Sequence, residues 1–138
     1  MDIAALDSVK AANNGFELEL FHPGTMVNLG LFITVLGKDS AEFRKVSSAQ
    51  NRKRLQKATK GGGFRAGAVS MEEIEQDSIE LLAACTVLWR DGDKKTLTFA
   101  GKELECTPEN AKQVYTDYPW IREQVDAGVS DRANFIKT

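Results

Sequence analysis

The sequence predicts an α+β fold that is mainly helical, and three kinds of pattern lead to this prediction. Residues 16–20 alternate apolar and acidic side chains, with the two-residue period of a strand that is buried on one face. Residues 39–60 and 70–90 each open with a capping pattern and are long enough to form a helix. Two later segments place a proline at the first helical position, where its missing N–H group costs nothing.

A β-hairpin is expected near the N-terminus. Residues 1–14 end in a turn signal and form either a short helix or a loose end. The strand over residues 16–20 is followed by the turn sequence His22-Pro23-Gly24-Thr25. Residues 29–36 are rich in β-branched and aromatic side chains, and they are expected to form the second and more buried strand. A lone hairpin is marginal in water, so it must pack against the rest of the chain.

Residues 39–60 are predicted to form a long and unusually basic helix. Asp39 is expected to cap its first N–H groups, and Glu42 stands three positions later, where a capping box places its acid. Few of its residues are apolar, and lysine and arginine occupy much of the remainder. A helix this polar buries at most a narrow stripe, so it projects into solvent or onto a partner. We expect its far end and the segment that follows, about residues 50–69, to form a mobile basic arm.

Residues 70–90 are predicted to form the central core helix. Ser70 is its expected cap, with Glu73 completing the capping box, and Asp91-Gly92-Asp93 ends it. Its apolar side chains recur with the 3.6-residue period of a helix face. They are Ile74, Leu81, Leu82, Cys85, Leu88 and Trp89.

The last third of the chain is predicted to form a small hairpin and the C-terminal helices. Residues 96–99 and 103–106 flank a short turn and form the hairpin or an extended loop. Three helix starts follow, at Thr107-Pro108, at Asp117-Tyr118-Pro119 and at Ser130-Asp131. Gly128 is expected to close the second of these helices.

The composition argues against several classes of protein. A chain of 138 residues with 42% hydrophobic residues can fold as a single domain without metal or disulfide. No apolar run approaches the roughly 20 residues that cross a bilayer, and no secretory signal is recognised, so we expect a cytoplasmic protein. Cys85 and Cys106 are expected to be unpaired thiols, and the single histidine, His22, gives no zinc cluster and no catalytic dyad. We therefore expect no metal, no cofactor and no enzymatic activity.

The charges are unevenly distributed along the chain. Residues 38–65 hold nine basic and two acidic residues, whereas the rest of the chain holds nine basic and eighteen acidic residues. Contact with an acidic protein surface explains this basic segment best, and a solvated helix or nucleic-acid binding through residues 44–65 are the alternatives. Nucleic acid is the less favoured partner because no aromatic residue that could stack on a base lies between Phe43 and Phe64.

The candidate partner-binding residues are the cations of this segment and one tryptophan. They are Arg44, Arg52, Lys53, Arg54, Lys57, Lys60 and Trp120. Trp120 follows Pro119 at a helix start, so it either packs in the core or contacts a partner. Trp89 is expected in the core.

Four segments of the chain match one known family in their order and spacing. Residues 32–44 read FITVLGKDSAEFR, and an acidic segment rich in leucine and alanine ends at Trp89. The start TPENA at residues 107–111 follows, and then PWIREQV at 119–125, with Asn134-Phe135 beyond it. These segments resemble the tail assembly chaperones of long-tailed bacteriophages, and the resemblance covers about residues 16–135.

The resemblance implies a non-enzymatic role in the host cell cytoplasm. Proteins of this family bind the tape measure protein, keep it soluble and help to recruit tail tube protein around it, and they are absent from the mature virion. Many are also made in a longer form by ribosomal frameshifting, in which case these residues are the short form. Self-association into a helical or open oligomer would let many weak contacts coat a long target. A small nucleic-acid-binding or regulatory protein and a structural tail component are the alternative functions.

Overall fold

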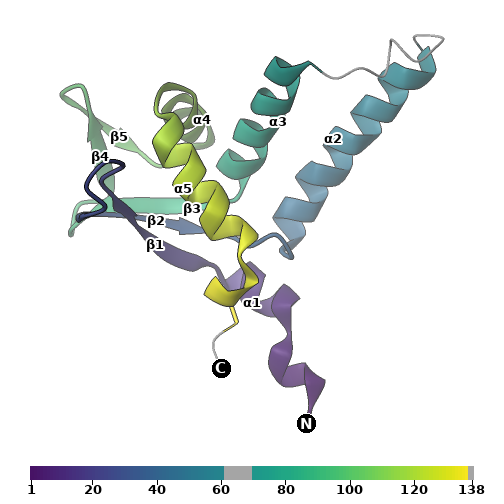
Figure 1. Ribbon diagram of the computed structural model, residues 1–138, viewed down its shortest axis with the longest axis horizontal. Coiled ribbons are helices and arrows are strands. Elements are labelled where there is room, and N and C mark those ends of the chain that lie inside the picture. The colour runs from purple at the N-terminus through teal and green to yellow at the C-terminus, as the bar shows by residue number, and fades with distance from the viewer. Residues whose placement is uncertain (61–69, 137–138) are drawn as a thin grey trace.

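A three-stranded antiparallel sheet lies at the centre of the protein (Figure 1). The computed structural model describes residues 1–60 and 70–136, with side chains up to residue 57 in the first range. The strands are β1 (Phe16–Phe21), β2 (Asn28–Val35) and β3 (Thr86–Asp91), with β2 in the middle. The predicted N-terminal hairpin is therefore confirmed.

The connection between β1 and β2 explains the single histidine. Nδ1 of His22 accepts hydrogen bonds from the N–H groups of Gly24 and Thr25, each at 3.0 Å. His22 thus stabilises the turn. Each strand has two buried residues, which are at most 7% exposed, so the expectation that β2 is more buried than β1 is not confirmed. Only one face of the sheet is covered, so being the middle strand adds no burial on the other face.

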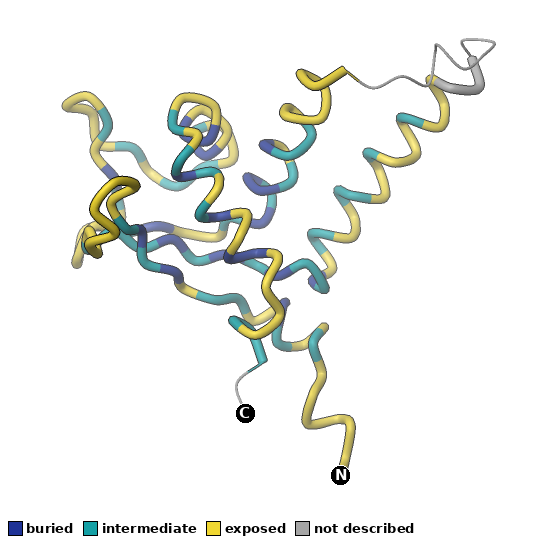
Figure 2. The backbone as a smooth tube through the Cα atoms, in the orientation of Figure 1, coloured by how far each residue is buried: buried dark blue, intermediate teal, exposed yellow. Residues whose placement is uncertain are grey.

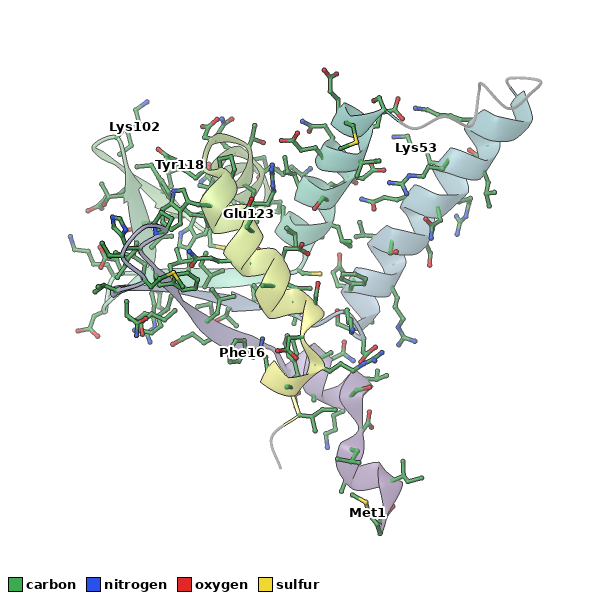
Figure 3. The ribbon with its side chains drawn as sticks, in the orientation of Figure 1. Met1, Phe16, Lys53, Lys102, Tyr118 and Glu123 are labelled. Carbon is green, nitrogen blue, oxygen red and sulfur yellow. The ribbon has the colours of Figure 1, made fainter. Side chains whose placement is uncertain are left out.

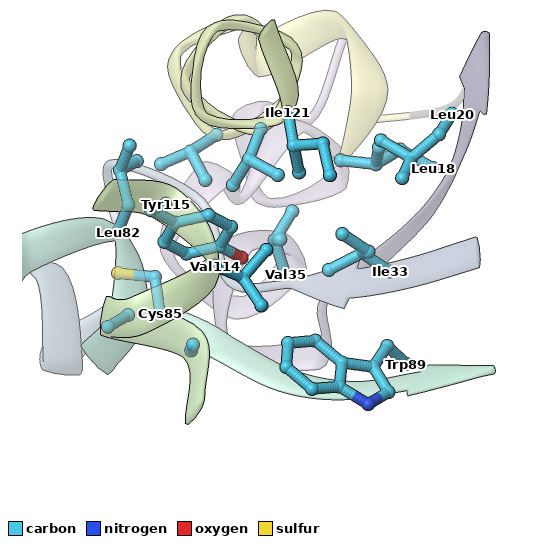
Figure 4. Packing of buried hydrophobic residues seen from close by; sticks show 14 of the residues in the cluster. Leu18, Leu20, Ile33, Val35, Leu82, Cys85, Trp89, Val114, Tyr115 and Ile121 are labelled. Atoms are coloured by element: carbon cyan, nitrogen blue, oxygen red, sulfur yellow. The ribbon is translucent and has the colours of Figure 1, made fainter. Parts of the chain in front are cut away.

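Three helices cover one face of the sheet, as Figure 1 shows. They are α3 (Met71–Ala84), α4 (Pro108–Asp117) and α5 (Pro119–Ser130), and together with the sheet they enclose the hydrophobic core (Figure 4). The sheet contributes Leu18, Leu20, Ile33, Val35 and Trp89 to this core, and the helices contribute Ile79, Leu82, Val114, Tyr115, Ile121, Val125 and Val129. The predicted α+β class, mainly helical and with C-terminal helices, is confirmed.

The predicted core helix over residues 70–90 is correct only in its first part. Ser70 caps α3 as predicted, since its Oγ accepts a hydrogen bond from the N–H of Glu73 at 3.1 Å. The helix ends at Ala84, however, and the next residues form β3, which pairs with β2 so that Trp89 stands opposite Ile33. The sequence of β3, TVLWRD, is rich in β-branched and aromatic residues, and β2 offers it an open edge for pairing.

Two residues assigned to the core face of that helix are exposed for this reason. Leu88 is 44% exposed because successive strand residues point to opposite faces, and the neighbouring Trp89 takes the inner side. Ile74 is 45% exposed because the first turns of α3 extend beyond the core. Trp89 itself is fully buried, as predicted, and its Nε1 donates a hydrogen bond to the carbonyl oxygen of Leu104 at 2.9 Å.

The C-terminal elements follow the prediction with two corrections. Strands β4 (Thr96–Phe99) and β5 (Lys102–Glu105) form the predicted hairpin, and Thr107 caps α4. Helix α5 has no side-chain cap, so Asp117 does not cap it. Gly128 does not end α5 either: it is buried within the helix, where a Cβ atom would lie 2.7 Å from Cδ2 of Leu18. This glycine lets the helix approach β1 closely.

Short helices form the two ends of the described chain. A 3-10 turn, η1 (Ile3–Leu6), precedes helix α1 (Ser8–Asn14), so the first residues are helical and not loose. At the other end Asp131 caps η2 (Arg132–Asn134) by accepting a hydrogen bond from the N–H of Ala133 at 3.0 Å, as predicted.

Candidate partner-binding surface

Helix α2 (Ala41–Lys60) extends away from the rest of the molecule (Figures 1 and 2). Over residues 41–57, whose side chains the structure describes, none is fully buried. Phe43, near the start of α2, packs against the edge of the core. The long basic helix is therefore confirmed, and the part of the predicted basic arm that follows residue 60 lies outside the described residues.

The start of α2 is capped differently from the prediction. Ser40, which is fully buried, accepts a hydrogen bond at its Oγ from the N–H of Phe43 at 3.2 Å. Oδ1 of Asn13, in α1, accepts another from the N–H of Ala41 at 2.9 Å. Asp39 is not the cap, because its carboxylate is held by Nε and Nη2 of Arg132 at 2.6 and 2.9 Å. Segments from both ends of the chain thus fix the base of α2.

The ion pair with Arg132 makes stability at the base of α2 depend on pH. Hydrogen bonding to Arg132 is the main cause that lowers the pKa of Asp39 from 3.8 to about 2. Because the pKa is lower in the folded chain than in the unfolded chain, the stabilisation is complete well above pH 3.8 and is lost as the pH falls toward about 2.

Replacing Asp39 with asparagine is expected to lower the free energy of unfolding near neutral pH by roughly 1 kcal/mol, a modest value because Arg132 is exposed. Urea titrations at about pH 6 and about pH 3 test this, since the difference between wild type and variant should shrink at the lower pH. A difference that stays constant over this range would show that Asp39 acts through packing and not through its charge.

The side of α2 that faces α3 forms its inner face, defined by Phe43, Gln50, Arg54 and Lys57. Nη2 of Arg54 lies 2.7 Å from Oδ2 of Asp77, and Nε2 of Gln50 donates to the carbonyl oxygen of Asp77 at 2.8 Å. Nζ of Lys57 lies 3.6 Å from Oε1 of Glu73. These contacts bound a polar groove of about 420 Å³ between the two helices. Acidic residues of α3 therefore neutralise the inner cations of α2.

The opposite side of α2 forms its outer face, defined by Arg44, Lys45, Arg52 and Leu55. With 3.6 residues per turn, Arg52 lies almost opposite Arg54 around the helix axis. Arg44, Lys45 and Arg52 are exposed, and none of them forms an ion pair with the described residues. Leu55 is 69% exposed on the same face. The outer face thus offers three cations and an apolar side chain to solvent.

The structure divides the predicted site residues into separate groups. Arg44 and Arg52 lie on the outer face, while Arg54 and Lys57 lie on the inner face. Lys53 lines the groove beside α3 (Figure 3), and the side chain of Lys60 lies outside the described residues. The sequence interpretation missed Lys45, although it stands seven residues before Arg52 and hence on the same side of a helix.

Trp120 lies apart from the cations, at the start of α5. It is partly buried against the core and lines a cavity of about 360 Å³ together with Phe99 and Tyr118. The rings of Phe99 and Tyr118 lie 5.3 Å apart between centroids. The structure therefore does not bring Trp120 together with the basic residues, and its packing favours the core interpretation.

The two cysteines are free thiols, one buried and one partly buried. Burial raises the pKa of Cys85 to about 12 and the pKa of Cys106 to about 11. A thiol is a good nucleophile or metal ligand only when it is deprotonated. Within residues 1–60 and 70–136, no group of three or more His, Cys, Asp or Glu side chains is arranged to hold a metal ion.

Comparisons with protein families, with curated proteins and with solved structures find no match to this chain. No helix in the described part of the chain is long and apolar enough to cross a membrane.

Proposed function

We propose that this protein is a phage tail assembly chaperone that acts in the host cell cytoplasm and has no catalytic activity. It binds the tape measure protein, keeps it soluble and helps to recruit tail tube protein. The proposal rests on the sequence resemblance to that family and on one structural observation. This observation is the outer face of α2, where Arg44, Lys45 and Arg52 are exposed and without acidic partners in the described structure.

The division of charge on α2 supports binding through the outer face. Arg54 and Lys57, on the inner face, already form ion pairs with carboxylates of α3. A partner could therefore bind these two cations only by breaking those ion pairs. The outer cations need no such exchange, and a partner with acidic residues along a helix can pair with them directly. Because single exposed ion pairs are weak, many copies along one long partner would supply the affinity.

The same face favours a protein partner over nucleic acid. Leu55, which is 69% exposed, lies on the same side of the helix as these cations, and an apolar side chain in a charged surface suits the mixed surface of a protein interface. A single-strand nucleic-acid surface would combine cations with aromatic side chains for base stacking, and α2 has only Phe43, which packs against the core.

Co-expression of this chain with a phage tape measure protein tests the proposed function. The tape measure protein is expected to move from the insoluble to the soluble fraction and to co-purify with this chain. A tape measure protein that stays as insoluble with this chain as without it would exclude the proposed function. Salt-dependent binding to DNA or RNA, with a slope that requires several phosphate contacts, would instead support a nucleic-acid-binding protein.

A further inference from the structure

The cavity beside Trp120 lies between the central sheet, the β4–β5 hairpin and the start of α5. Its volume of about 360 Å³ is at the lower end of the roughly 300–1,000 Å³ that is usual for ligand sites. Tyr118 stands at the junction of α4 and α5, and Trp120 follows in the first turn of α5 (Figure 3). The cavity therefore has room for a single side chain and not for a large ligand.

Three aromatic side chains form part of the cavity wall, namely Phe99, Tyr118 and Trp120. Phe99 and Tyr118 pack against each other, so these two rings hold each other in place. Trp120 packs only partly against the core, and it also borders the cavity. The other lining residues are apolar, apart from Asp91 and Thr98. Aromatic rings in an apolar setting attract organic cations through their π faces.

Asp91 is the only charged residue among the described residues that line this cavity. Its carboxylate forms no ion pair with the part of the chain that the structure describes. Two cations close to it in the sequence are paired elsewhere. Nη2 of Arg90 lies 2.6 Å from Oε1 of Glu17, and Nζ of Lys94 lies 3.4 Å from Oε1 of Glu103. The cavity thus combines aromatic and apolar walls with one negative charge that a bound cation could neutralise.

The turn of the β4–β5 hairpin fixes one side of the cavity. Ala100, which lines the cavity, has a φ of 51°, and Gly101 follows with a φ of 81°. Two successive residues with positive φ suit the twist of a hairpin, but a residue with a Cβ atom rarely adopts this conformation. Backbone conformations of this kind cluster at binding sites. The cavity wall next to Phe99 is therefore held in a conformation that the local sequence does not favour.

We propose that this cavity binds an arginine side chain of a basic partner polypeptide. The guanidinium group is planar, so it can stack on an aromatic ring while its N–H groups bind the carboxylate of Asp91. The methylene groups of the same side chain contact the apolar walls. A lysine side chain supplies the charge without the planar group, and an apolar side chain leaves Asp91 unpaired. The proposal is independent of α2 and of the function proposed above.

A short acetylated and amidated peptide of glycine and serine, with arginine at its centre, is the probe. Binding is followed by NMR through the indole N–H signals of the intact protein, which has two tryptophans. The Trp120 signal is expected to shift saturably with peptide concentration. The Trp89 signal is the internal control and should change little, because Trp89 is fully buried and its Nε1 donates to Leu104.

Two further peptides test the chemistry of the bound group. Citrulline in place of arginine keeps the shape of the side chain but removes its charge, and it is expected to bind at least about tenfold more weakly. Lysine in place of arginine keeps the charge but not the planar group, and it is expected to bind about threefold more weakly. Equal binding of the citrulline peptide would overturn the proposal, since the cavity would then recognise apolar groups alone. Equal binding of the lysine peptide would overturn the choice of arginine.

A pair of protein variants tests the role of Asp91. Asp91→Asn is expected to weaken binding of the arginine peptide by about tenfold. Asp93→Asn is the matched control, because Asp93 is exposed and lines a different groove, and this variant should bind normally. Equal affinities of the two variants, or no saturable shift of the Trp120 signal in the wild type, would overturn the proposal. A Trp120 shift that grows with protein concentration alone would also overturn it, by assigning the cavity to a second copy of this chain.

Discussion

Replacing Trp89 with alanine is expected to lower the free energy of unfolding by about 4 kcal/mol. Trp89 is fully buried, packs 6.3 Å from the ring of Phe99, and connects the sheet to the β4–β5 hairpin through its hydrogen bond to Leu104. The substitution removes a large core side chain and leaves the carbonyl group of Leu104 without that donor. Because small domains are stabilised by only about 5–15 kcal/mol, the variant should unfold at a much lower urea concentration.

Trp120→Ala provides the matched control for this experiment. The same side chain is removed, but from a partly buried position, so the expected loss is about 1–2 kcal/mol. Trp89→Phe loses the hydrogen bond but keeps an aromatic ring and hence part of the packing. Its loss of unfolding free energy should therefore lie between those of the two alanine variants. Equal losses for Trp89→Ala and Trp120→Ala would contradict the assignment of Trp89 to the centre of the core.

Replacing Arg44, Lys45 and Arg52 together with glutamine is expected to weaken capture of the tape measure protein by about tenfold. Each exposed ion pair contributes only a few tenths of a kcal/mol to about 1 kcal/mol, and the three contributions combine. The midpoint of thermal unfolding should stay nearly unchanged, because these side chains make no ion pair with the described residues. The salt concentration that releases the tape measure protein from the co-purified complex provides the measurement.

The matched variant for this comparison is Arg54→Gln with Lys57→Gln, on the inner face of α2. It removes the ion pairs with Asp77 and Glu73, so it is expected to loosen α2 from α3 and to reduce capture less than the outer variant does. Equal effects of the two variants would show that the division of α2 into two faces has no role in binding. Unchanged capture with the outer variant would show that its charges are incidental.

The sequence predicts the order of the elements well, and its main error is at the end of α3. Leu88 and Trp89 continue the helical spacing of Leu81 and Cys85, so a local pattern places them on one helix face. The structure instead places residues 86–91 beside β2, about fifty residues earlier in the chain. A pairing between such distant segments leaves no local signal beyond the β-branched and aromatic character of TVLWRD.

The candidate site could be located from the sequence but not divided into its two faces. The basic composition of residues 38–65 identifies α2 as the charged element. It cannot show that Arg54 and Lys57 meet Asp77 and Glu73, because that depends on how α2 packs beside α3. The cap was misassigned for a similar reason. Asp39 and Glu42 have the spacing of a capping box, so the local sequence favours Asp39 over Ser40 as the cap. In the structure Arg132, almost a hundred residues away, binds the carboxylate of Asp39.

The side chains of α2 can be substituted with little effect on the stability of the core. Along α2, from Val46 to residue 57, no side chain is fully enclosed, so most substitutions there create no cavity and leave the core intact. Altering one outer cation at a time would therefore shift affinity in small steps while the melting temperature stays almost fixed. Variants with different charge patterns on this helix could be selected for new partners without first acquiring compensating mutations elsewhere.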